Sequence, residues 1–210
     1  MYKDRQEGGV RLATFLKTYH KAKETIVLGL PRGGVVVANE VAKSLDLPLD
    51  VICPRKIGAP GNPEYAIGAT TAQGEPIFNE EALAQIRPSR AWLDQAARSE
   101  AEEADKRERR FREGKPTRDL EGKTVILIDD GLATGLTMKA ALQQVKQEGA
   151  AKTVVAVPVA PFDTLEELRA LADEVICPLT PAFFMAIGEF YEDFGQTSSE
   201  EVMQILRGKR

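Results

Sequence analysis

The sequence predicts an α/β protein whose parallel sheet is covered by helices on both faces. Strand-like apolar runs alternate with helical stretches along the chain, and these runs lie at 25–30, 49–53, 124–128, 153–159 and 174–177. The run at 124–128 is apolar nearly throughout, which is typical of a strand buried on both faces. Ligands of such sheets gather beyond the carboxyl ends of the strands, so we expect the site there.

Helices are expected between these strands and before the first one. Asp4 is a suitable cap for a helix over 4–19, and the connecting helices are expected at 35–45, 138–148 and 163–172. A longer helix is expected over 92–112, where acidic residues precede basic ones by four positions in the pairs Glu102/Lys106, Glu103/Arg107, Asp105/Arg109 and Glu108/Arg112. Pairs of this kind indicate a solvated helix surface.

We expect one domain over 1–210, because 210 residues with 43% hydrophobic content can bury one sizeable core. The core is predicted at about 22–56 and 120–180. A Gly/Pro-rich flexible loop at 57–63, a hairpin of 65–71 with Ile77 and Phe78, and the long helix form an insertion at about 57–115. A small hood is expected at about 178–195.

Composition excludes several classes of function. The net charge of −4 and the lack of a cationic block argue against nucleic-acid binding, and no apolar run reaches membrane-spanning length. With no signal sequence evident, a cytoplasmic protein is expected. Cys53 and Cys177 lie in strand contexts and are expected to be buried thiols. The one histidine, His20, is expected on a helix surface, which excludes hydrolases built on Ser/His or Cys/His pairs.

The segment 125–137 carries the clearest chemical signal. A buried strand leads to Asp129 and Asp130 and then to a Gly/Thr loop that opens a helix. The first amides of that helix lack intrahelical partners and suit a phosphate, and hydroxyl groups of Thr134 and Thr137 add donors. The two carboxylates are then free for ribose hydroxyls or a hydrated magnesium ion. The alternative is that Asp130 only starts a turn and Thr137 only caps a helix.

The tetrapeptide 31–34, Pro-Arg-Gly-Gly, lies between a predicted strand and a predicted helix. Its small residues allow successive amides to face one concavity, and Arg32 offers a charged fork, so a diphosphate suits it. Read alone, the same four residues are also consistent with an ordinary strand-to-helix turn.

The segment 125–137 resembles the signature of the type I phosphoribosyltransferases, which transfer the phosphoribosyl group of 5-phosphoribosyl 1-diphosphate to a nitrogen nucleophile with magnesium. The resemblance implies that Asp129 and Asp130 contact the ribose hydroxyls and hold the metal through water or ribose. It also implies that the 5'-phosphate lies on the loop formed by Gly131, Leu132, Ala133, Thr134, Gly135, Leu136 and Thr137. In an ATP-binding P-loop a lysine follows the second glycine, whereas here Leu136 follows Gly135. This segment is therefore unlike a P-loop.

By the same resemblance, Arg32, Gly33 and Gly34 bind diphosphate, and this loop holds a strained peptide bond. Arg55 and Lys56, followed by a Gly/Pro segment and Glu64, are similar to the mobile catalytic loop of adenine phosphoribosyltransferases. Cations that close over a departing diphosphate offset its growing charge, so Arg55 and Lys56 are the candidate catalytic cations. Glu64 is the candidate acid/base at the acceptor nitrogen; the alternative is an exposed carboxylate without a function.

The acceptor is less well defined than the donor. The 6-oxopurine enzymes carry an aspartate where this chain has Ala133, which argues against hypoxanthine or guanine. An alanine at this position matches the adenine enzymes. The insertion before Asp129 is longer than in those enzymes, however, so the alanine does not identify adenine as the acceptor. Aromatic residues Phe183, Phe184 and Tyr191 are expected to cover a planar acceptor in the hood, or alternatively to seal the edge of the core.

These observations predict a magnesium-dependent phosphoribosyltransferase of nucleotide metabolism, acting on a nitrogenous acceptor and releasing diphosphate. The expected partners are phosphoribosyl diphosphate and a small planar acceptor, and a homodimer is expected. The alternative is a non-catalytic sensor that binds phosphoribosyl diphosphate. Arg55, Lys56 and Glu64 favour the enzyme, since a sensor does not need a closing loop.

Overall fold

A five-stranded parallel sheet forms the centre of the protein. The computed structural model describes residues 1–115 and 118–208. The strand order is β2-β1-β6-β7-β8. These strands are β1 (Thr25–Gly29), β2 (Leu49–Val51), β6 (Thr124–Ile128), β7 (Lys152–Ala156) and β8 (Glu174–Ile176). The predicted parallel α/β sheet is confirmed.

Helices cover both faces of this sheet. Residues of α1 (Arg5–Ala13), α2 (Gly33–Leu45) and α7 (Ser199–Arg207) share one hydrophobic cluster with Val27 and Ile126. Residues of α5 (Leu136–Gln147) and α6 (Phe162–Arg169) share another with Leu28 and Leu127. Neighbouring residues of one strand thus point to opposite faces, which explains why the strands read as continuous apolar runs.

The first helix is shorter than predicted. α1 begins after the Asp4 cap, whose side chain accepts from the Glu7 amide, but it ends at Ala13. The hydroxyl of Thr14 donates to the Arg11 carbonyl oxygen, which competes with continuation of the helix. A short 3-10 helix, η1 (Lys17–Tyr19), completes the connection to β1.

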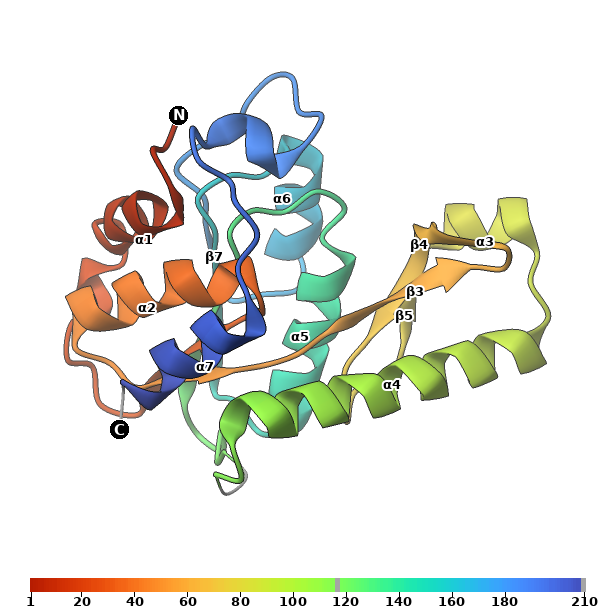
Figure 1. Cartoon of the computed structure of the whole chain (residues 1–210), viewed down its shortest axis with the longest axis horizontal. Coiled ribbons are helices and arrows are strands. Elements are labelled where there is room, and N and C mark those ends of the chain that lie inside the picture. The colour runs from red at the N-terminus through yellow and green to blue at the C-terminus, as the bar shows by residue number, and fades with distance from the viewer. Residues whose placement is uncertain (116–117, 209–210) are drawn as a thin grey trace.

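An arm projects from the main sheet and holds the predicted insertion (Figure 1). It consists of a three-stranded antiparallel sheet with β3 (Arg55–Ala59), β4 (Asn62–Thr70) and β5 (Ile77–Phe78), and of α3 (Glu80–Ile86) and α4 (Arg90–Arg112). The predicted β4–β5 hairpin is confirmed by the antiparallel pairs Gly68 with Phe78 and Ala69 with Ile77. α3, capped by Asn79, was not predicted.

The segment 57–63 is not the irregular loop that its glycines and prolines predict. Most of it belongs to a hairpin of β3 and β4, closed by a turn that contains Gly61 at φ +75°. Ile57 and Ile67 bury their side chains in the small core of the arm, so packing outweighs the local composition. Register shifts on either side of Gly58 are the remaining trace of the irregularity.

Parallel pairing of β1 with β6 brings two loops together. Thr25 pairs with Thr124 and Gly29 with Ile128, so the strands end level with one another. The amide of Leu30 donates to the Ile128 carbonyl oxygen at 2.8 Å, which continues the pairing past the strand ends. The loops that follow, at 31–34 and 129–135, therefore lie side by side at the carboxyl edge of the sheet.

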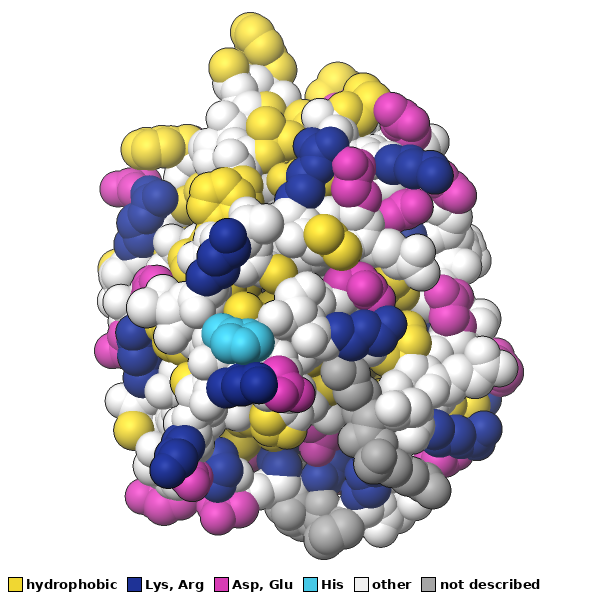
Figure 2. Space-filling model, turned by 90° about the vertical axis from the view of Figure 1, so that its left-hand side faces the viewer, with side chains coloured by type: hydrophobic (Ala, Val, Ile, Leu, Met, Phe, Trp, Pro, Cys, Tyr) yellow, Lys and Arg dark blue, Asp and Glu magenta, His cyan; other side chains and the backbone are white. Residues whose placement is uncertain are grey.

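Several smaller predictions concern the surface and the thiols. Figure 2 shows the only histidine side chain, His20, on a surface where basic and acidic side chains are interspersed. Cys53 is buried and Cys177 half-buried, both as free thiols. On α4 the predicted pair Asp105/Arg109 forms, while Lys106 binds Glu103. No helix in the described part of the chain is long and apolar enough to span a membrane.

Arg118 joins α4 to the main body, and its replacement is expected to destabilise the fold. Its side chain is 4% exposed and binds Glu108 of α4, Glu148 and the Val51 carbonyl oxygen. Arg118→Met leaves two buried carboxylates without their cation, which we expect to lower the free energy of unfolding by about 3 kcal/mol. Urea denaturation measures this loss, and Arg98→Met on the exposed surface of α4 is the control. Equal stability of the two variants would contradict the prediction.

Candidate active site

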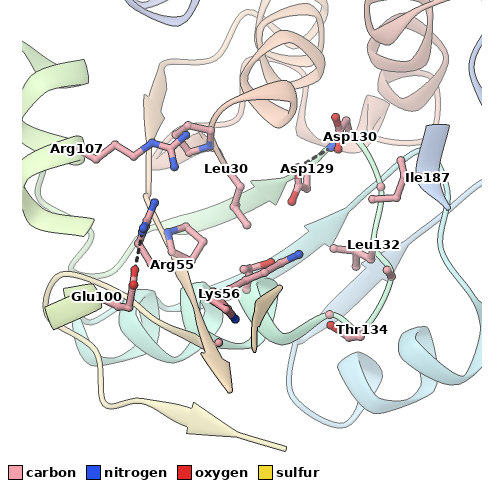
Figure 3. A pocket seen from close by; sticks show the side chains of 18 residues that line it. Leu30, Arg55, Lys56, Glu100, Arg107, Asp129, Asp130, Leu132, Thr134 and Ile187 are labelled. Carbon is pink, nitrogen blue, oxygen red and sulfur yellow. Dashed lines mark hydrogen bonds and ion pairs between the residues drawn. The ribbon is translucent and has the colours of Figure 1, made fainter. Parts of the chain in front are cut away.

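A cavity of about 490 Å³ lies beyond the carboxyl ends of β1 and β6, where the sequence predicts the site (Figure 3). It is bounded by the loops after these strands, by the arm and by one hood residue. Its lining comprises Leu30, Pro31, Pro54, Arg55, Lys56, Gly58, Pro63, Glu100, Arg107, Asp129, Asp130, Gly131, Leu132, Ala133, Thr134, Gly135, Thr137 and Ile187.

The loop between β6 and α5 forms one end of the cavity. Gly135 caps α5 at φ +71°, a conformation that favours glycine, so the first amides of the helix lie beside the cavity. Two hydrogen bonds hold the loop in place. The Thr164 hydroxyl of α6 donates to the Ala133 carbonyl oxygen at 2.6 Å, and the Leu132 amide donates to the Val159 carbonyl oxygen. Thr134 and Thr137 line the cavity, whereas the Leu136 side chain is buried.

Asp129 is the less buried of the two adjacent aspartates that line the cavity. One of its oxygens, Oδ1, accepts from the Asp130 amide at 2.8 Å. Burial, and next the neighbouring charge of Asp130, raise the pKa of Asp129 well above its usual range. An acid held in this way gains from any ligand that supplies hydroxyl donors or positive charge.

Asp130 is not free, in contrast to the prediction for both carboxylates. The Arg5 side chain at the start of α1 binds it, with 2.7 Å between Nε and Oδ2, and both side chains are nearly buried. The same guanidinium donates to the Gly195 carbonyl oxygen at 2.6 Å and lies 3.8 Å from the centre of the Phe194 ring. The Tyr191 hydroxyl donates to the Asp130 carbonyl oxygen. The amino-terminal helix and the hood thus jointly fix the position of Asp130.

Gly33 and Gly34 begin α2 against the two carboxylates. A Cβ atom on Gly33 would lie 2.0 Å from Asp130 Oδ2, and one on Gly34 would lie 2.7 Å from Asp129 Oδ1. Neither glycine has a positive φ. Close approach is the reason for glycine here. The Pro31–Arg32 peptide bond is cis, and the exposed Arg32 side chain points to a neighbouring cavity.

Basic residues of the arm form the other end of the cavity. Arg55 and Lys56 line it from β3, and Arg55 binds Glu100 of α4 with 2.8 Å between Nε and Oε2. Arg107 reaches the cavity from α4 (Figure 3) and was not predicted to lie there. Glu64 is exposed on β4 and lies outside the cavity lining.

The predicted hood residues occupy different positions. Phe183 is 90% exposed, and Phe184 stacks on Phe190 with 5.4 Å between ring centres. Tyr191 is 5% exposed and packs between Tyr2 and Phe194. Because its ring is covered by these neighbours, it is not available for stacking on a ligand. Among the described hood residues it is Ile187 that lines the cavity.

The arrangement suits a ligand with negative charge at both ends. Helix amides and threonine hydroxyls lie on one side of the cavity, Arg55 and Arg107 on the opposite side, and Lys56 and the Asp129 carboxylate between them (Figure 3). Arg5, Glu100, Arg107 and Ile187 were missed. They lie on three elements that are far apart in the sequence, α1, α4 and the hood, and carry no local motif, so the sequence offered no signal for them.

Comparison with known proteins identifies relatives along nearly the whole chain. The family model described as the phosphoribosyl transferase domain matches residues 1–194. Two Mycobacterium tuberculosis proteins, from strains CDC 1551 and H37Rv, are 43% identical over 206 residues and carry the provisional name of phosphoribosyl transferase. That alignment covers 98% of this chain and 46% of each relative, so the chain spans about half of their length.

Solved structures agree with the fold. The protein TT1426 from Thermus thermophilus is 44% identical, with a TM-score of 0.80 over 98% of this chain and 97% of that one. AQ2163 from Aquifex aeolicus is 13% identical with a TM-score of 0.50, covering 82% of this chain and 73% of its own, and the likeness is in the fold alone.

The raised pKa of Asp129 predicts a pH-dependent effect of Asp129→Asn on stability. A carboxyl whose pKa is higher in the folded than in the unfolded chain stabilises the fold at low pH, and this contribution is lost as pH rises through the folded pKa. The variant is therefore expected to match the native chain in free energy of unfolding near pH 4 and to exceed it at pH 8. Chemical denaturation at both pH values measures the difference. The exposed Asp94→Asn serves as control, and a gain that is equal at both pH values would refute the assignment.

Proposed function

Because this chain belongs to the phosphoribosyl transferase domain family, we propose that it is a magnesium-dependent phosphoribosyltransferase that acts on a planar, nitrogenous acceptor. It breaks the bond from C1 of the ribose to the diphosphate oxygen and forms a bond from C1 to the acceptor nitrogen. The observation that carries the proposal is the cavity itself, with anion donors at both ends and Asp129 between them.

We orient the donor in the cavity by matching its charges to the residues that line it. We assign its 5'-phosphate to the 131–137 loop, where backbone amides and the hydroxyls of Thr134 and Thr137 act as donors. Its ribose hydroxyls then face Asp129. Its diphosphate extends toward Arg55 and Lys56, with Gly33 and Gly34 allowing the start of α2 to approach.

We assign magnesium to this site as an ion that the substrate brings with it. Within the described residues no group of three or more His, Cys, Asp or Glu side chains is placed to cage a metal. Magnesium commonly keeps several waters and binds through one or two carboxylates together with phosphate oxygens, and Asp129 is the carboxylate available for this. When bound, the ion would help to neutralise the departing diphosphate.

The basic residues of β3 act on the leaving group. Negative charge grows on the diphosphate as its bond to the ribose breaks, and Lys56 and Arg55 neutralise that charge in the transition state. Glu64 remains our candidate for accepting the acceptor proton. This role requires the end of the β3–β4 hairpin to move toward the cavity, since Glu64 is exposed outside the lining.

A sensor of phosphoribosyl diphosphate is the second candidate, and one observation favours it. Arg5 already neutralises Asp130, which leaves a single carboxylate for the ribose and the cation. One carboxylate is sufficient for a protein that only binds the donor. The two candidates differ in whether diphosphate is released.

Turnover distinguishes the two functions. We expect the protein to release diphosphate from phosphoribosyl diphosphate in the presence of magnesium and one member of a panel of purine, pyrimidine and pyridine bases. A coupled assay for diphosphate across the panel measures this. Donor binding in calorimetry without release by any base would favour the sensor, and absence of both would reject the two functions together.

Lys56→Ala is expected to lower kcat about 100-fold while weakening donor binding less than about threefold, because the charge it opposes grows only as diphosphate departs. Steady-state kinetics and calorimetry with the donor measure the two effects. Lys23→Ala, which removes an exposed lysine far from the cavity, is the control. If only KM rises, Lys56 contacts the donor in its ground state and the catalytic role is wrong.

A further inference from the structure

A second cavity lies beside the candidate active site, on the surface of α4. Its volume is about 470 Å³, within the range of small-molecule sites. We call it the α4 cavity. Among the described residues that line it, the charged side chains are Arg32, Arg55, Lys106, Arg107, Arg110 and one acid, Glu103.

Three of the basic residues that line the α4 cavity pair with carboxylates: Arg55 with the partly exposed Glu100, Lys106 with Glu103 and Arg110 with Glu200. Lys106 and Glu103 pair across an exposed part of α4, and Arg110 lies 3.5 Å from Glu200 with both side chains more than half exposed. Exposed pairs of this kind contribute little, so an incoming anion displaces them readily. In the described part of the chain, neither Arg32 nor Arg107 has a carboxylate within ion-pair distance.

Arg107 is the most constrained of these residues. It is partly buried, and its guanidinium carbon lies 5.5 Å from the centre of the Phe111 ring. Burial, and further the charges of Arg55 and Arg32, lower the pKa of Arg107. The Arg32 and Arg107 guanidinium groups repel each other and Arg55, whose charge Glu100 offsets in part, and a bound anion would relieve that repulsion.

We propose that the α4 cavity binds a phosphate group, carried by inorganic phosphate or by a phosphorylated metabolite, at a site distinct from the donor cavity. Guanidinium groups present planar arrays of donors that match phosphate oxygens. The whole chain carries a net charge of −4, so the positive field at this cavity is local and arises from the grouping of these side chains.

The α4 cavity is coupled to the candidate active site through shared residues. Arg55 and Arg107 line both cavities. An anion in one cavity therefore engages donors that the other cavity uses, and the two anions repel each other. Phosphate in the α4 cavity is expected to weaken the binding of diphosphate in the neighbouring cavity several-fold.

Calorimetry with inorganic phosphate tests the site in the full chain. Lys106→Gln with Arg110→Gln removes two charges that line only the α4 cavity, and we expect it to weaken phosphate binding about tenfold. Arg98→Gln with Arg109→Gln removes the same charge from α4 outside both cavities and is expected to change binding less than twofold. Equal weakening by both variants would reduce the effect to general surface charge and overturn the proposal. Unchanged binding in the first variant would overturn it as well.

A measurement on the unaltered chain gives independent evidence. Phenylglyoxal modifies accessible arginines, and phosphate is expected to protect Arg110 several-fold more than Arg98, as read from peptide masses. Protection confined to Arg55, which lines both cavities, with none at Arg110 would place the anion in the donor cavity alone and reject the site.

The source of the phosphate is read from a short series of ligands. Inorganic phosphate, ribose 5-phosphate and AMP are titrated into the native chain and into the Lys106→Gln/Arg110→Gln variant. Equal sensitivity of all three to the substitutions indicates that the phosphate group alone is recognised, and greater sensitivity of AMP indicates a phosphorylated metabolite. None of these measurements requires turnover, so the site can be established or refuted whether or not the chain is a transferase.

Discussion

The close approach of the α2 amino terminus to the acidic pair is the constraint on which the site depends. Level pairing of β1 with β6 brings the two loops together, and the missing Cβ atoms of Gly33 and Gly34 leave room for the carboxylates of Asp130 and Asp129. A side chain at either glycine would push the loops apart. The amides that open α2 and the carboxylates after β6 then occupy the same small volume, which is what a ligand with both phosphate and hydroxyl groups requires.

Arg5 extends this constraint to both ends of the chain. Its guanidinium touches Asp130, the Gly195 carbonyl and the Phe194 ring, so α1, the sheet edge and the hood meet at one side chain. The pairing also explains an asymmetry between the adjacent acids. Asp130 is neutralised within the protein and serves the fold, while Asp129 is left partly exposed and with a raised pKa, ready to interact with a ligand.

Local signals in the sequence were sufficient for the sheet and for the loops at its carboxyl edge. Strand-helix alternation is a property of neighbouring residues, and so are the Asp129 to Thr137 and Pro31 to Gly34 segments. Contacts between distant segments were not predictable in this way. Arg5 lies 125 positions from Asp130 in the sequence, and Tyr191 is buried against the ring of Tyr2. No spacing in the sequence indicates either contact. The β3–β4 hairpin was missed because Ile57 and Ile67 overrule the glycines and prolines around them.

The two ends of the candidate active site belong to different structural units, and this difference bears on how the site works. The 131–137 loop is held by the main sheet and by Thr164 of α6, whereas the basic end comes from β3 and α4 of the arm. Arg55 and Arg107 keep their places relative to each other because Glu100 binds Arg55 from α4. The basic end and the phosphate loop therefore depend on different packing contacts. A polyanionic ligand that spans the cavity would contact both units and so add a link between the arm and the sheet.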